Sequence, residues 1–374
     1  MDNYSTEESE EWWDEHYFKR SVCALHEEHD NVSLAITENR NAADNVIYLN
    51  NVLHLIIKSN GNIFSTGNKN GHKFIECKNE KVFDAIKRYY KYSNIQDITS
   101  TFPLHKFNPY IQLFFMNLKD KLVGKRDFNL IHYTDELVQN IVDMLNEFID
   151  SIRKTVESSK FKADLRQHQL LITKNHNSLL AYIDNLFKRH SRLMVLRVDF
   201  GYTKDIGIYM LNKKEIDEKY LEAKKDREHF FNNMRSNKLF DNMLGYAWKL
   251  EFASLKGFHY HMFFFFDGSK VREDVSIAMM IGEYWKKITS KRGIYYNCNA
   301  HKDTYDYLGI GMINHHDTEL MENLKHKAAP YLTKTDYYAK IHATGIGIGK
   351  TFSRGEMKAK VTNRGRPRKN ANTA

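Results

Sequence analysis

The 374-residue sequence has few of the features that mark disulfide-stabilised, membrane or secreted proteins. Its three cysteines lie far apart with no CxxC or CxH pairing, so we expect reduced thiols in a cytoplasmic protein. Proline is scarce, at four residues. The longest uncharged apolar run near any motif, 258–266, is far shorter than the roughly 20 residues that a membrane helix needs. The first 30 residues are acidic, which does not fit the basic-then-apolar pattern of a signal peptide.

What the sequence does contain is core-forming residues and an uneven charge. Hydrophobic residues make up 42% and aromatic residues 13%, so the chain can bury a core, and its length suggests two domains. The formal net charge is +9, but the two ends of the chain carry charges of opposite sign. Residues 1–30 carry ten acids against two bases, whereas 321–374 carry twelve bases against three acids. A basic body with a basic end is typical of a protein that binds a polyanion, most often nucleic acid.

The spacing of apolar residues predicts regular structure along most of the chain, and most clearly after about residue 175. In the first part, 46–57 is a strand or a buried helix. Helices are expected at 81–92, 134–158, 177–189 (with Asn177 as its cap), 214–236, 271–289 and 318–340, the last interrupted or restarted at Pro330. Strands are expected at 193–200, 246–253, 258–266, 294–297 and 308–313.

The order from residue 193 onward is β-α-β-β-α-β, which predicts an α+β fold of the split βαβ, ferredoxin-like type. We expect an antiparallel sheet with helices on one face and the other face free for a substrate. The predicted organisation has three parts: a mostly helical N-terminal region of unknown role at 1–165, an α+β domain that contains this sheet at 166–355 and a flexible basic tail at 356–374.

The densest chemical signal is a predicted hairpin that carries an acid and two histidines. His259 and His261 point to the same face of a strand because side chains alternate with a period of two. A turn near Leu255 places Glu251 opposite His259 on the neighbouring strand. Two imidazoles and one carboxylate on a rigid sheet can hold a divalent metal and leave coordination positions open, as a catalytic site requires.

A second cluster contains tyrosines and a lysine. On a helix, Tyr331, Lys334 and Tyr338 share one face. A tyrosine can attack a phosphodiester and form a covalent bond to it, and a neighbouring lysine stabilises the negative charge. The same spacing recurs at Tyr337 and Lys340, so the pattern alone does not name the nucleophile.

Together these clusters resemble the HUH endonuclease superfamily, in which a His-hydrophobe-His strand holds a metal and a downstream helix carries a nucleophilic tyrosine. More narrowly, 190–355 is similar to the inovirus replication proteins that also occur in prophages as YagK/YfjJ-like proteins. The matching blocks are LMVLRVDFGY (193–202), WKLEFASLKGFHYHMFFFFDGS (248–269), IGEYWKKIT (281–289), YYNCN (295–299), GIGMINHHD (309–317), YLTKTDYY (331–338) and KTFSRG (350–355).

The resemblance implies rolling-circle replication initiation in a bacterial host cell: a metal-dependent nick in single-stranded origin DNA that leaves a 5′-phosphotyrosyl link and a free 3′-OH. By that resemblance, Mg²⁺ or Mn²⁺ would be held by Glu251, His259 and His261, with Tyr331 as nucleophile and Lys334 as its partner. The sequence departs from the family's pattern at two places. Tyr260 is bulkier than the usual aliphatic residue between the histidines, and the Tyr337-Tyr338 doublet leaves Tyr338 as a second candidate nucleophile.

Basic residues expected to contact DNA are Arg197, Lys350, Arg354, Arg366 and Arg368. The glycine-rich segment 345–351 fails the spacing of a phosphate-binding loop, so a host helicase is expected alongside a host polymerase. The alternative function is a non-catalytic DNA-binding regulator on the same fold. An RNA-binding module is disfavoured, because the outward face of the hairpin carries histidines in place of stacking aromatics.

Overall fold

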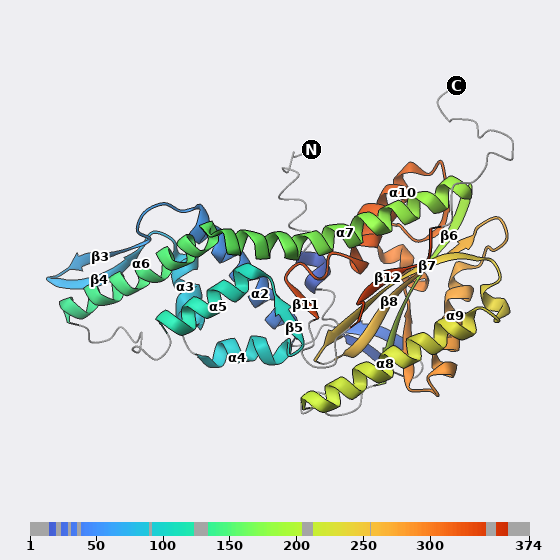
Figure 1. Cartoon of the computed structure of the whole chain (residues 1–374), viewed down its shortest axis with the longest axis horizontal. Helices are drawn as coiled ribbons and strands as arrows, with labels where there is room; N and C mark the ends of the chain where they lie inside the picture. The colour runs from blue at the N-terminus through green and yellow to red at the C-terminus, as the bar shows by residue number, and fades with distance from the viewer. Residues whose placement is uncertain are drawn as a thin grey trace, which may run out of the picture. The chain divides into compact units, whose positions relative to one another are not determined.

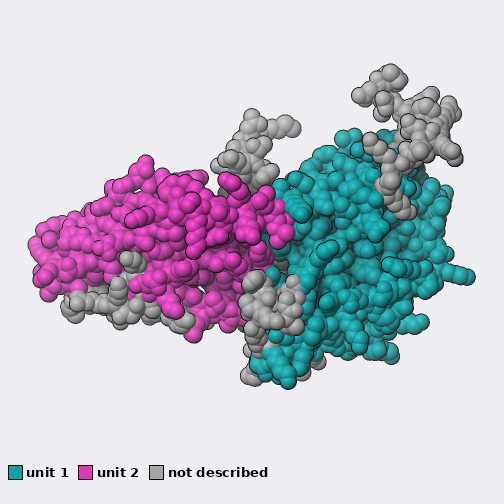
Figure 2. Space-filling view, in the orientation of Figure 1, with its two compact units in different colours: residues 1–37, 172–336, 341–374 teal, residues 38–171, 337–340 magenta. Residues whose placement is uncertain are grey.

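The chain has mixed α and β structure, as the alternating patterns predicted, in a computed structural model (Figure 1). The structure describes residues 15–19, 24–28, 31–35, 39–89, 92–122, 134–203, 212–254, 256–341 and 349–357. These residues belong to two compact units (Figure 2). Unit 1 is drawn from residues 1–37, 172–336 and 341–374, and unit 2 from 38–171 and 337–340. No helix in the described ranges is both long and apolar enough to cross a membrane.

Unit 2 is mostly helical, with two small pairs of strands. Its elements are α2 (Asn39–Lys58), β3 (Phe64–Lys69), β4 (His72–Cys77), α3 (Glu80–Tyr89), α4 (Tyr92–Thr101), β5 (His105–Phe107), α5 (Pro109–Lys121), α6 (Asp135–Glu157), the start of α7 (Ser159–Arg189) and most of β11 (Ala339–Ile341). The apolar run 46–57 is therefore helical. The helix predicted at 134–158 is confirmed by α6, and the Thr134 side chain caps it by accepting from the Leu137 N–H.

Unit 1 is built around a six-stranded antiparallel sheet. Its strands are β6 (Arg192–Tyr202), β7 (Met243–Ala253), β8 (Gly257–Asp267), β9 (Gly293–Asn297), β10 (Gly311–Asn314) and β12 (Phe352–Arg354). They pair in the order β10-β6-β8-β7-β12, and β9 also pairs with β6. The helices α8 (Lys213–Met234) and α9 (Asp274–Ile288) connect β6 to β7 and β8 to β9. Unit 1 also contains β1 (Ala24–Glu28), β2 (Asn31–Ala35), the short helices η2 (Lys238–Phe240) and η3 (Cys298–Thr304), and α10 (Thr318–Asn323).

One face of the sheet packs on α8 and α9, as expected from the prediction that helices cover one face. Tyr260 donates from its hydroxyl to the Ala223 carbonyl of α8 at 3.1 Å. Phe200 of β6 stacks on Trp285 of α9, with ring centroids 4.7 Å apart. The aromatic side chains that alternate with the histidines on β8 therefore anchor the sheet in the core.

The expectation that the opposite face is free was wrong in part. The C-terminal half of α7 and the segment that follows α10 pack on it, and Tyr182 of α7 contacts Phe265. The physical reason is that Val195, Phe263 and Phe265 share this face with the histidines and need to be buried.

Two predicted helices have different bounds in the structure. Asn177 caps nothing, because α7 runs through it without interruption. The helix expected at 318–340 is wrong beyond residue 332: α10 continues as one π-helical turn, η4 (Leu324–Ala328), and one 3₁₀ turn, η5 (Ala329–Leu332). Turns then lead to β11, which pairs with β5. Tyr331 and Tyr338 therefore do not share a helix face.

Candidate functional site

The β7–β8 hairpin has the predicted register. Glu251 lies directly opposite His259, and Lys249 lies opposite His261. Gly257, at φ +69°, begins β8 in the left-handed conformation that glycine adopts without strain. The alternation of the two strands thus brings the acid and both histidines to one face of the sheet.

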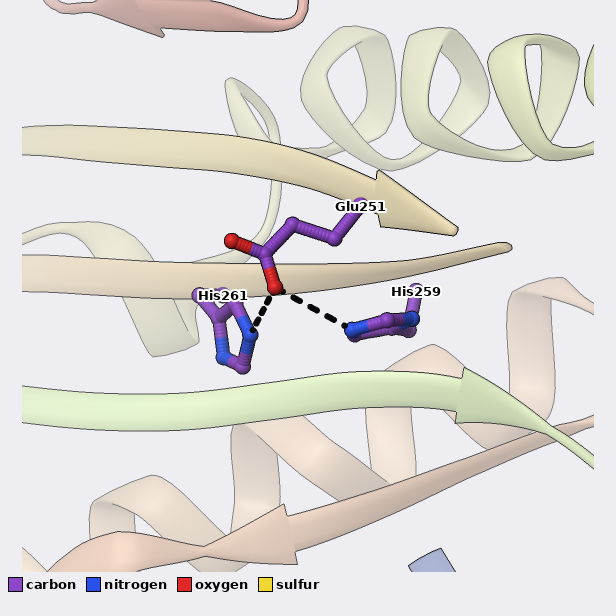
Figure 3. Close-up of side chains that lie close together, drawn as sticks. All are labelled: Glu251, His259 and His261. Atoms are coloured by element: carbon purple, nitrogen blue, oxygen red, sulfur yellow. Dashed lines mark hydrogen bonds and ion pairs between the residues drawn. The ribbon is translucent and has the colours of Figure 1, made fainter. Parts of the chain in front are cut away.

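The three side chains converge on a single carboxylate oxygen (Figure 3). Glu251 Oε2 lies 3.1 Å from His261 Nε2 and 3.4 Å from His259 Nε2. Their ligand atoms all lie within 4.8 Å of one another. All three side chains are buried, with exposed fractions of 6% for Glu251, 0% for His259 and 4% for His261. We call these three residues the metal triad.

Each histidine is oriented by a contact at its other ring nitrogen. His259 Nδ1 lies 3.1 Å from the Gly257 carbonyl oxygen, to which it donates in the tautomer that leaves Nε2 open. His261 Nδ1 lies 2.7 Å from Asp199 Oδ1, on the neighbouring strand β6. Such outer contacts fix ring orientation in metal sites and direct the remaining nitrogen toward the ion. Both Nε2 atoms here face Glu251.

The electrostatics of the triad suit a cation. Burial, together with the charge of Lys256, lowers the pKa of His259 to about 4, so this imidazole is neutral and able to ligate at pH 7. Burial alone would lower the pKa of His261, but the carboxylates of Asp199 and Glu251 outweigh burial and raise it. Burial likewise opposes the ionisation of Glu251, yet the histidine partners hold its pKa well below the usual range.

These features fit a divalent metal. Two imidazole nitrogens and one carboxylate oxygen are a donor set that first-row divalent ions accept. Glu251 Oε1 is buried with no hydrogen-bond partner among the described residues, which is costly unless a cation binds there. In the part of the chain that the structure describes, the metal triad is the group of His, Cys, Asp or Glu side chains that lie close enough together to share one ion.

Asp199 is a site residue that the sequence analysis missed. Its carboxylate is buried between His261 and Arg197, with Oδ1 3.5 Å from the Arg197 Nε atom. The available signal was the pair Arg197 and Asp199, two charges at alternate positions of an otherwise apolar strand. Arg197, expected to contact DNA, is itself 4% exposed and holds its guanidinium 4.1 Å from the centre of the Tyr331 ring.

The contacts therefore lead from the metal triad to the candidate nucleophile within unit 1. Tyr331 lies in η5, and its half-buried ring lines a pocket of about 120 Å³ together with Arg197 and Lys327. Tyr331 Oη lies 2.9 Å from His16 Nε2. The turn that follows is tied to the hairpin by an ion pair of 2.5 Å between Asp336 and the buried Lys249.

A family model for the YagK/YfjJ C-terminal domain matches residues 153–347, which is more than half of the chain. The chain belongs to this family. The matched region includes the metal triad, Asp199, Arg197 and Tyr331. Comparison with curated proteins and with solved structures gave no match.

The remaining candidates of the YagK/YfjJ domain lie apart from the triad or are committed to other contacts. Lys334 follows η5 and is half-buried. Its backbone N–H donates to the Pro330 carbonyl at 2.8 Å. Tyr338 is fully buried and belongs to unit 2, where its carbonyl accepts from the Asn108 N–H at 2.9 Å. Its burial and its place beside β11 distinguish it from Tyr331.

The basic residues predicted to bind DNA differ in their surroundings. Lys350 is exposed. Arg354 lies on β12 and donates from Nε to the Ser178 carbonyl and hydroxyl, at 3.0 and 2.9 Å. Arg366 and Arg368 lie outside the described residues.

Proposed function

We propose that this YagK/YfjJ protein is an HUH-type endonuclease that initiates rolling-circle replication by nicking single-stranded origin DNA. The observation that carries the proposal is the unbroken series of contacts from Glu251 through His261, Asp199 and Arg197 to Tyr331. It joins a candidate metal site to a nucleophile that lines a cationic pocket. The strand order β9-β6-β8-β7, with antiparallel neighbours and helical connections, supports the ferredoxin-like fold on which such enzymes are built.

In this mechanism the metal triad would hold Mg²⁺ or Mn²⁺, which acts as a Lewis acid on the scissile phosphate when bound. Tyr331 Oη attacks the phosphorus and forms a 5′-phosphotyrosyl bond. The bond from phosphorus to the 3′ oxygen breaks, and that oxygen takes up a proton to give the 3′-OH primer. Arg197 stabilises the developing phenolate through its buried charge over the ring. Lys334, three residues after Tyr331 in the sequence, is proposed to supply a further cation to the phosphate.

The proposal also names the partners and the setting of the reaction. The substrate is single-stranded because the sheet face and Tyr331 must both reach the backbone at one phosphodiester. A host helicase then separates the strands in the bacterial cytoplasm, and a host polymerase extends the 3′-OH. The exposed Lys350 and the basic C-terminal residues contribute salt-dependent contacts to phosphates.

The test is a covalent-adduct assay. The protein is incubated with labelled single-stranded DNA from its own replicon, with Mn²⁺ or EDTA, and the products are separated on a denaturing gel. We expect a protein-linked band that needs Mn²⁺, is lost in Tyr331→Phe and Glu251→Gln, and is retained in Tyr338→Phe. Loss in Tyr338→Phe alone would keep the mechanism and reassign the nucleophile. DNA binding without any adduct would favour the non-catalytic regulator.

A further inference from the structure

The N-terminal helical segment 15–19 places a histidine against the candidate nucleophile. His16 Nε2 lies 2.9 Å from Tyr331 Oη, across 315 residues of sequence. The next residue fixes the segment: Tyr17 is fully buried, its ring lies 4.7 Å from that of Tyr331, and its hydroxyl donates to the Lys327 carbonyl at 3.0 Å. The histidine is therefore held at the reactive oxygen by a packed neighbour.

We propose that His16 is a catalytic residue, the general base that takes the proton of Tyr331 as this tyrosine attacks DNA. The inference rests on the proposed function and deepens it. In the tautomer with its proton on Nδ1, the Nε2 lone pair of His16 accepts from the Tyr331 hydroxyl. The distance of 2.9 Å between His16 Nε2 and Tyr331 Oη is within the range that a general base needs to abstract a proton.

His16 and water account for the protons that move in this step. The O–H bond of Tyr331 breaks, its proton moves to His16 Nε2, and the phenolate oxygen forms the bond to phosphorus. The bond from phosphorus to the 3′ oxygen breaks, and the leaving oxygen takes a proton from water. The histidine returns its proton to solvent, so the net charge of the phosphodiester is unchanged. In the reverse, rejoining step, protonated His16 gives the proton back to the departing phenolate.

The surroundings of the pair favour proton transfer over a purely structural hydrogen bond. Arg197 lies on the face of the Tyr331 ring, and Arg197, Lys327 and His16 all line the same pocket. A phosphate that enters this pocket meets two cations and the hydroxyl together. A tyrosine hydroxyl is a weak nucleophile until it loses its proton, so a base that contacts this oxygen should accelerate the attack.

The experiment compares His16 variants of the full chain in the Mn²⁺-dependent adduct assay. His16→Gln keeps a polar side chain of similar reach but cannot take a proton, and we expect the adduct to form about a hundredfold more slowly. His16→Ala should be equally slow and should recover activity when imidazole is added to the buffer. His72→Gln, an exposed histidine of β4 in unit 2, is the matched control and should match the parent.

A second readout separates a base from a structural contact. Replacing Tyr331 with trifluorotyrosine lowers the phenol pKa, so that the phenolate forms without a base. We expect this replacement to remove most of the difference between the parent and His16→Gln. A merely structural role of His16 would leave that difference unchanged and would give no rescue by imidazole.

The outcomes distinguish this inference from the proposed function. An adduct that depends on Tyr331 and forms at the parental rate in His16→Gln overturns the role of His16 alone. A faster reaction in His16→Gln also overturns it, because the segment would then inhibit the nucleophile. Failure of the parent to form any adduct overturns the proposed function itself.

Discussion

Replacing Asp199 with asparagine removes one negative charge from the centre of the site and keeps its size. The Asp199 carboxylate is 2% exposed and lies 2.7 Å from His261 and 3.5 Å from Arg197. The variant leaves the Arg197 guanidinium buried without its carboxylate and replaces the charged acceptor that orients His261 with a neutral amide. We therefore expect a loss of both stability and metal affinity.

The size of each loss follows from these distances. At 3.5 Å, with an effective dielectric constant of about 20, the attraction between Asp199 and Arg197 is about 5 kcal/mol. Asparagine avoids the cost of burying a carboxylate, so we expect a net loss of about 3 kcal/mol, within the range for breaking a buried pair. That corresponds to a Tm lower by roughly 6–12 °C for a unit of this size. Loss of the negative charge at the outer contact to His261 should weaken Mn²⁺ binding by about ten- to a hundredfold.

Calorimetry measures both quantities, and a second ion pair with a buried aspartate provides the control. The buried Asp226 on α8 pairs with the partly exposed Arg292 at 3.0 Å, on the opposite face of the sheet. Asp226→Asn should therefore lower the Tm and leave Mn²⁺ affinity unchanged. An Asp199→Asn protein whose Mn²⁺ affinity stays within about threefold of the parent would refute the role of Asp199 in orienting His261.

Three further predictions concern the same unit. Lys256→Met removes a cation whose charge lowers the pKa of His259, so Mn²⁺ should bind several-fold more tightly in titration calorimetry, and weaker binding would contradict the assignment. Burial, Lys334 and His326 lower the pKa of His176 to about 4 from a usual value near 6.5, so the unfolded state binds more protons between these values. Stability should therefore fall as pH drops from 6.5 to 4, by about 1–2 kcal/mol after allowance for solvent screening, and His176→Gln should flatten this part of a urea-unfolding profile. Gly257→Ala should lower stability by about 1 kcal/mol because of its positive φ, whereas an unchanged urea midpoint would show that the turn relaxes.

The hairpin and its metal triad could be predicted because local sequence determines them. Side chains alternate between the two faces of the sheet from Phe258 to Phe266, so both histidines must lie on the same face. A short turn closing at Gly257 then sets the register of Glu251 against His259. Asp199 could not be placed in the same way. No turn links β6 to β8, and a slip of one residue would move its side chain to the other face.

The segment around the tyrosines was mispredicted because tertiary contacts override its helical spacing. Asp336 pairs with the buried Lys249, and residues from 339 onward form strand β11 in place of a further helical turn. The contact of His16 with Tyr331 has no local signature at all, since the two residues lie at opposite ends of the chain. Such long-range contacts become visible only once the sheet is assembled.

The measurement that tests the account most directly is mass spectrometry of the protein after reaction with origin DNA and Mn²⁺, followed by nuclease and trypsin. Trypsin separates the candidates, because peptide 328–334 contains Tyr331 alone among the tyrosines, whereas 335–340 contains Tyr337 and Tyr338. We predict a nucleotide attached through its 5′ phosphate to peptide 328–334, absent when EDTA replaces Mn²⁺. A nucleotide on 335–340, or none on either peptide from protein that binds the DNA, would contradict the central claim.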